Sequence, residues 1–125
     1  MSSKSLRNIV SYPAIVGQVL SKLRKNNKFE QADFAKIIGV TQSTLSRIET
    51  GASALTIEQL AMAADELYVT PAYILELADE SVQDLQRQGI EIQNNRVSEG
   101  LDKGMVILGA AAIATVIALI VSKSK

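Results

Sequence analysis

Short polar side chains and one arginine follow each other closely between residues 42 and 47, at spacings that place them on one face of a helix. These residues are Gln42, Ser43, Thr44, Ser46 and Arg47. Amide and hydroxyl groups hydrogen-bond to the edges of bases, and a guanidinium group binds either guanine or phosphate. The residue types therefore favour contact with double-stranded DNA.

Two short helices joined by a tight turn are expected to position these side chains. Apolar residues recur at helical spacing on both sides of the turn: Phe34, Ala35 and Ile38 before it, Leu45 and Ile48 after it. Gly39 can adopt the left-handed conformation that ends a helix, and Thr41 can cap the helix that follows. The pattern predicts a helix-turn-helix whose second helix reads DNA.

A longer pattern at fixed spacing surrounds this motif. It includes Leu23-Arg24, Gln31-Ala32-Asp33-Phe34-Ala35, Gly39-Val40-Thr41-Gln42-Ser43-Thr44-Leu45-Ser46, Ile48-Glu49-Thr50-Gly51 and Leu60-Ala61-Met62-Ala63-Ala64-Asp65-Glu66-Leu67. On these residues the segment 14–76 resembles the phage-repressor/Cro type of helix-turn-helix, the XRE family. The resemblance implies an all-α, five-helix repressor-like domain that binds DNA. Glu30 departs from the family pattern, which usually has Thr or Ser there as the cap of the second helix.

The resemblance also implies roles for single residues. Gln42 matches the family residue that contacts a base, and Gln31 matches the one that binds a phosphate and steadies this glutamine. Lys28 stands beside the motif, at the end of a basic cluster that begins at Lys22, where it could contact a phosphate. The predicted DNA-binding residues are Lys28, Gln31, Thr41, Gln42, Ser43, Thr44, Ser46 and Arg47.

Arg24 and Glu49 have a different role in this comparison. The matching residues of the family form an ion pair that ties the first helix to the end of the reading helix. We expect the same pair here, as part of the structure and not of the DNA contact.

The 125-residue chain contains no cysteine and no histidine. This composition excludes disulfides, thiol nucleophiles and imidazole bases, and it removes the usual zinc ligands. Because no group of carboxylates or lysines is spaced for catalysis, the sequence predicts a protein that is not an enzyme and needs no metal or cofactor. The formal net charge of zero gives no support to DNA binding, so that prediction rests on the local motif.

Changes in composition divide the chain into five segments. We expect a flexible N-terminal segment over residues 1–12, the helix-turn-helix domain over 13–78, a helix extension and linker over 79–103, a transmembrane helix over 104–121 and a short tail over 122–125.

The transmembrane prediction rests on eighteen uncharged residues, Gly104 to Val121. As a helix they would be about 27 Å long, close to the ~30 Å hydrocarbon core of a bilayer. They predict a single-pass anchor in the cell inner membrane, with the N-terminal domain in the cytoplasm. A buried helix of a soluble domain is the alternative.

The predicted function combines these features. The chain is expected to bind double-stranded DNA sequence-specifically as a transcriptional regulator, a repressor, tethered to the membrane. We expect a homodimer, formed by the anchor or by a seam of apolar residues at heptad spacing, Leu75, Ala78, Val82 and Leu85. The alternative is a membrane-anchored docking module for an unidentified protein, because some bacterial cell-shape proteins use such a domain to bind a cytoskeletal filament.

Overall fold

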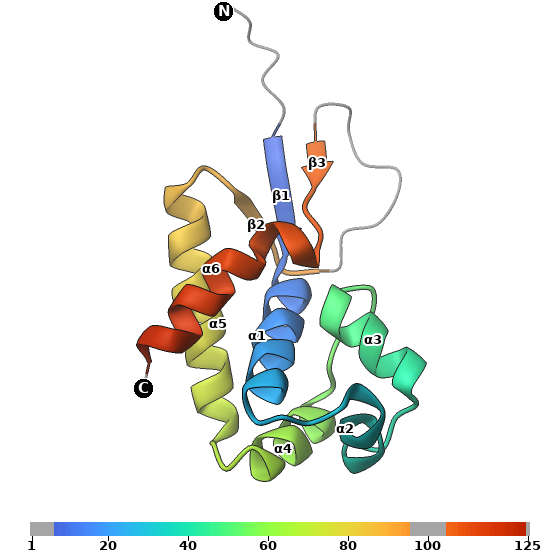
Figure 1. Cartoon of the computed structure of the whole chain (residues 1–125). Coiled ribbons are helices and arrows are strands. Elements are labelled where there is room, and N and C mark those ends of the chain that lie inside the picture. Colours follow the sequence, from blue (N-terminus) through green and yellow to red (C-terminus); the bar gives the residue numbers. More distant parts are fainter. Residues whose placement is uncertain (1–6, 96–104, 125) are drawn as a thin grey trace, which may run out of the picture.

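The computed structural model describes residues 7–95 and 105–124, and in these residues the chain forms six helices and three short strands (Figure 1). In chain order they are β1 (Arg7–Ser11), α1 (Tyr12–Asn26), α2 (Gln31–Ile37), α3 (Gln42–Thr50), α4 (Ile57–Glu66), α5 (Pro71–Arg87), β2 (Glu91–Gln93), β3 (Met105–Ile107) and α6 (Ala110–Lys123).

Side-chain caps fix where most of these helices begin. Ser11, Thr41 and Thr70 each accept a hydrogen bond from a backbone N–H in the first turn of the helix that follows. Thr56 and Gln59 form a reciprocal capping box at the start of α4. At α2 the cap position holds Glu30, whose side chain makes no such bond. The start of α2 therefore depends on packing more than on a cap.

The core lies around α1, which has α3 on one side and α5 on the other (Figure 1). Fully buried Ile15, Val19 and Leu20 of α1 belong to the same apolar cluster as Leu45 of α3 and Ile74 of α5. At Gly17 the contact between α1 and α3 is so close that a Cβ atom would lie 2.0 Å from the carbonyl oxygen of Ile48. A residue without a side chain therefore sets the distance between the two helices.

A small parallel sheet completes one end of the domain, and the sequence did not predict it. Its strand order is β2-β1-β3, so β1 lies in the middle, with Ile9 opposite both Glu91 and Ile107. Ile9 and Val10 are fully buried. The all-α prediction is therefore incomplete, and residues 7–11 of the segment predicted to be flexible form the central strand. Strands as short as three residues leave no alternating pattern that a sequence could reveal.

The predicted transmembrane helix is wrong. None of the helices in residues 7–95 and 105–124 is long and apolar enough to cross a membrane. The apolar run is divided into β3 and the 14-residue helix α6, and the part before residue 105 lies outside the described residues. In α6, one side packs on α1 and α5 and buries Ile113, Val116, Ile117, Ile120 and Val121.

This correction also removes the predicted location in the cell inner membrane and the predicted membrane partner. The physical reason is that an apolar segment needs a surface to cover it. The apolar sides of α1 and α5, on which α6 packs, provide that surface. Composition alone does not distinguish lipid from a protein surface, so the alternative of a buried helix describes α6 better.

A hydrogen bond of 2.8 Å from the Tyr12 hydroxyl to the Asp79 carboxylate links the start of α1 to α5. Burial of the phenol, together with this bond and the nearby negative charge, raises the pKa of Tyr12 from 10.0 to about 12. Because the folded state holds the phenolic proton more tightly, the stabilisation is complete below pH 10 and is lost as the pH rises towards 12. We expect the free energy of unfolding in urea to fall over this pH range. Tyr12→Phe, which has no phenolic proton to lose, should remove this contribution to the pH dependence.

Candidate nucleic-acid interface

The turn between α2 and α3 directs one face of α3 outward. Gly39 has a φ of +78°, in the left-handed region, and the Thr41 side chain accepts a hydrogen bond from the backbone N–H of Thr44. Leu45 and Ile48 then face the core. The outer face of α3 carries five of the predicted residues: Gln42, Ser43 and Arg47 are exposed, and Thr44 and Ser46 are half-buried.

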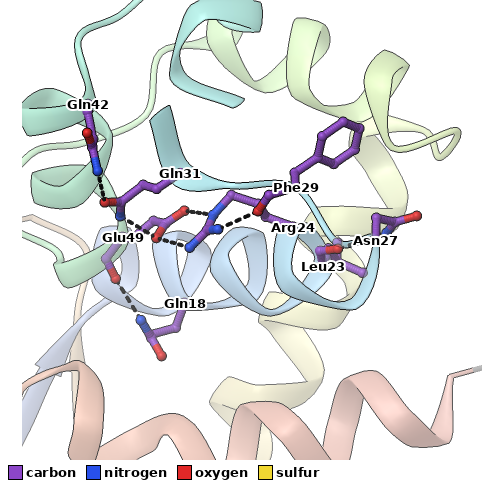
Figure 2. Close-up of polar contacts among 8 residues, drawn as sticks. All are labelled: Gln18, Leu23, Arg24, Asn27, Phe29, Gln31, Gln42 and Glu49. Carbon is purple, nitrogen blue, oxygen red and sulfur yellow. Dashed lines mark hydrogen bonds and ion pairs between the residues drawn. The ribbon is translucent and has the colours of Figure 1, made fainter. Parts of the chain in front are cut away.

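A chain of hydrogen bonds connects this outer face to the interior (Figure 2). The Gln42 side-chain amide donates to the Gln31 oxygen over 3.3 Å, and the Gln31 amide donates to a Glu49 carboxylate oxygen over 3.0 Å. Gln31 is the first residue of α2, so the bonds cross from α3 to α2 and back to α3. They fix the direction of the Gln42 amide before any ligand is bound.

This chain of hydrogen bonds ends at the ion pair between Arg24 of α1 and Glu49 of α3. Arg24 Nε donates to one carboxylate oxygen over 2.7 Å and Nη2 donates to the other over 3.1 Å, which is a bidentate pair. The side chains are only 8% and 5% exposed. A third nitrogen of Arg24 donates to the backbone carbonyl of Phe29, 2.8 Å away. The guanidinium thus joins α1, α3 and the loop before α2.

The other predicted residues lie around this centre without joining the chain of bonds. Arg47 Nε donates to the hydroxyl of Ser53 in the loop after α3, over 3.2 Å. The hydroxyl of Thr41 bonds to that of Thr44, so this side chain is engaged within the cap. Lys28 lies exposed in the loop between α1 and α2, with a φ of +66°. Ser43 points outward at the start of α3.

Two contacts of this region were missed by the sequence analysis. Gln18 of α1 donates to the backbone carbonyl of Glu49 over 2.8 Å, and this bond helps to hold the C-terminal end of α3. Ser53 accepts from Arg47. No local pattern indicates either one, because Gln18 is an ordinary polar residue of an amphipathic helix and its partner is 31 positions away.

The described part of the chain offers no other chemistry at this face. In residues 7–95 and 105–124, no three acidic residues lie close enough together to hold a metal ion. Every buried side-chain nitrogen and oxygen there has a hydrogen-bond partner. The face presents a fixed amide, three hydroxyl groups and the Arg47 guanidinium, which suits recognition of base edges and phosphates.

Comparison with known proteins bears on the helix-turn-helix itself. Residues 20–74 match the model of the helix-turn-helix family. A curated relative, the antitoxin PezA of Streptococcus pneumoniae, is 36% identical over 44 residues, which are 35% of this chain and 28% of PezA. The match therefore spans little more than a quarter of the length of that relative.

Two solved structures share the fold. The clp gene regulator ClgR of Corynebacterium glutamicum aligns with a TM-score of 0.57 and 24% identity, over 62% of this chain and 84% of ClgR. A point mutant of the restriction-modification controller protein C.Esp1396I aligns with a TM-score of 0.53 and 23% identity, over 58% of this chain and 95% of its own. Family match and fold agree that this chain carries a helix-turn-helix domain.

Proposed function

We propose that this protein regulates transcription by binding double-stranded DNA sequence-specifically through the outer face of α3. The observation that carries the proposal is the chain of hydrogen bonds from Gln42 through Gln31 to the buried Arg24–Glu49 pair. These bonds hold the exposed Gln42 amide in one direction. A glutamine that only meets solvent has no need of such bonds, so the fixed direction favours a role in binding. The matched proteins named as a gene regulator and a controller support the same function.

In the proposed complex α3 lies in the major groove and its first residues meet the bases. The Gln42 amide can donate to and accept from an adenine at once, and Ser43 lies beside it. Thr44 and Ser46 contribute hydroxyl contacts, whereas Arg47 meets a guanine or a phosphate. Gln31, Thr41 and Lys28 lie at the edge of this face, where the DNA backbone passes.

We propose repression as the direction of regulation, because a protein that occupies its site on DNA excludes other proteins from it. The chemistry of the face is that of binding, and we assign it no catalytic role. Metal ions and cofactors have no part in the proposed mechanism.

Gln42→Ala tests the proposal. We expect this variant to lose roughly 1–3 kcal/mol of discrimination at one base position, which is about a 5-fold to 150-fold change in relative affinity. The measurement is selection of random duplex DNA by the whole chain at constant salt, followed by binding titrations on the enriched sequence. The matched control is Gln86→Ala, which removes an exposed glutamine on α5 and should leave the selected sequence and its affinity unchanged.

The outcome decides between the two functions considered. Enrichment of one sequence that Gln42→Ala fails to recognise supports a DNA-binding regulator. If the whole chain enriches no sequence and binds DNA only weakly and with strong salt dependence, the proposal is rejected. The helix-turn-helix would then serve as a docking module for another protein.

A further inference from the structure

A groove of about 310 Å³ lies between α1 and α6, and its α1 wall is cationic. Lys22 and Lys25 line it, and the residues that line it include no aspartate or glutamate. In residues 7–95 and 105–124, neither lysine forms an ion pair. Because the two lysines are three positions apart on a helix, their side chains lie next to each other. The groove therefore brings together two positive charges that the described part of the chain leaves without a counter-ion.

Ser21 supplies a hydroxyl group at the same wall. The residue is only 4% exposed, and its side chain has no hydrogen-bond partner among the described residues. Ser81, a buried serine of α5, instead donates to the backbone carbonyl of Leu77 over 2.8 Å. Every fully enclosed side-chain oxygen in the described residues has a partner, so the Ser21 oxygen is open to the groove that this residue lines. Since buried hydroxyl groups are normally hydrogen-bonded, this one indicates a place for a ligand.

The opposite wall of the groove belongs to α6 and is largely apolar. Ala114, Ile117 and Ala118 line it, and Thr115 adds one hydroxyl at its exposed edge. Apolar surface with a few polar groups, in a space of about 300 Å³ or more, is typical of sites for small molecules. The two walls therefore suit a ligand that is charged at one end and apolar at the other.

We infer that this groove binds a small organic phosphate monoester. A monoester carries about −1.5 to −2 charges at neutral pH and three acceptor oxygens, which matches two ammonium groups and a hydroxyl. The phosphate lies against Ser21, Lys22 and Lys25, and the short apolar group lies against α6. None of these residues belongs to the proposed DNA-binding face.

The groove also adjoins the support of the reading helix. Gln18 lines the groove, and its amide donates to the backbone carbonyl of Glu49 at the C-terminal end of α3 (Figure 2). A ligand in the groove thus lies next to a bond that holds α3. The significance of this contact for regulation rests on the proposed function; the binding of the ligand does not.

Phenyl phosphate is the probe for the test, titrated into the whole chain and followed by NMR. The amide signals of Ser21 and Lys22 and the methyl signals of Ile117 and Ala118 should shift together and saturate, with a Kd of roughly 1 mM or below. Phenol lacks the charge and inorganic phosphate lacks the apolar group. At the same ionic strength each should bind at least about tenfold more weakly.

Variants of the α1 wall test the contacts to the phosphate. Ser21→Ala should weaken phenyl phosphate binding by roughly fivefold. It should leave the thermal stability of the free chain unchanged, because the hydroxyl has no partner in the described residues. Lys22→Gln and Lys25→Gln should each weaken binding by about twofold to fivefold. Lys36→Gln, which removes an exposed lysine of α2, makes the same change in net charge and should have no effect.

Ala118→Leu tests the apolar end of the site. Ala118 is half-buried and lines the groove, so a larger side chain there should occupy the space of the phenyl group and abolish its binding. Thermal unfolding of this variant confirms that it is folded. The weak response to inorganic phosphate should remain, since Lys22 and Lys25 are unchanged.

Three results would overturn the inference: no shift of the groove signals with phenyl phosphate, equal effects of Lys22→Gln and Lys36→Gln, or equal binding of phenyl phosphate and inorganic phosphate. The last result would show that the lysines attract phosphate in general, as a contact to the DNA backbone does. Because none of these measurements contains DNA, such a failure leaves the proposed function to the Gln42→Ala experiment.

Discussion

Replacement of Glu49 by alanine should lower the free energy of unfolding by roughly 3–5 kcal/mol, as expected when one partner of a buried ion pair is removed. The guanidinium of Arg24 would remain buried, with the Phe29 carbonyl as its remaining acceptor among the bonds described above. The cost is the desolvation of a charge that no longer has a partner. Urea unfolding followed by circular dichroism measures the change.

The exposed pair of Arg7 and Glu91 is the matched control. Its atoms lie 3.3 Å apart, but the side chains are 50% and 46% exposed. Glu91→Ala should therefore cost no more than about 1 kcal/mol. If Glu49→Ala and Glu91→Ala were equally mild, the Arg24–Glu49 pair would not contribute to the fold as described.

Glu49→Ala should also weaken sequence-specific DNA binding at temperatures where the protein remains folded. Without the carboxylate, Gln31 loses the acceptor that holds its amide, and Gln42 loses its fixed neighbour. The effect of Gln42→Ala should consequently be smaller in the Glu49→Ala background than in the natural chain. A double-mutant cycle on the selected DNA sequence measures this coupling.

The second large effect is expected from Ile117→Ala in α6, which should lower the free energy of unfolding by about 2–5 kcal/mol. Ile117 is 1% exposed and lies on the side of α6 that packs on α1 and α5. Removing its outer carbons leaves a cavity among residues that cannot fully close it. Urea unfolding followed by circular dichroism is the measurement.

Leu119→Ala, two positions along the same helix, provides the comparison. Leu119 is 56% exposed, so under the same conditions its truncation should change the stability by about 0.5 kcal/mol or less. Similar small effects of both substitutions would contradict the packing of α6 on the domain. A large effect of Ile117→Ala alone supports it.

The sequence predicted the helix-turn-helix because the information there is local and dense. Apolar spacing, the left-handed Gly39 and the Thr41 cap all occur within a few residues, and each constrains the same turn. The resemblance also directed attention to Arg24 and Glu49, which the structure brings together across 25 positions. Spacing alone would not have indicated that contact.

The remaining part of the fold depends on contacts that no local pattern encodes. In the sequence, Val10 belongs to a polar N-terminal segment. In the structure it is fully buried, in a strand that has β2 on one side and β3 on the other. Residues 104–121 have the length and composition of a membrane helix. The predicted five-helix domain gave no indication that it has an apolar surface for a sixth helix to cover. That surface exists because α1 and α5 leave apolar side chains for α6 to cover.

The place of β1 in the sheet has a consequence for the order in which the chain folds. β1 precedes the other described elements in the chain, but both of its partners lie more than eighty positions further along. The α2–α3 contact, by contrast, joins neighbouring residues and closes a short loop. During synthesis we expect the turn and its reading helix to form early, while Ile9 and Val10 stay exposed to water and to chaperones. The strand β1 is thus completed only when segments much further along the chain are available to pair with it.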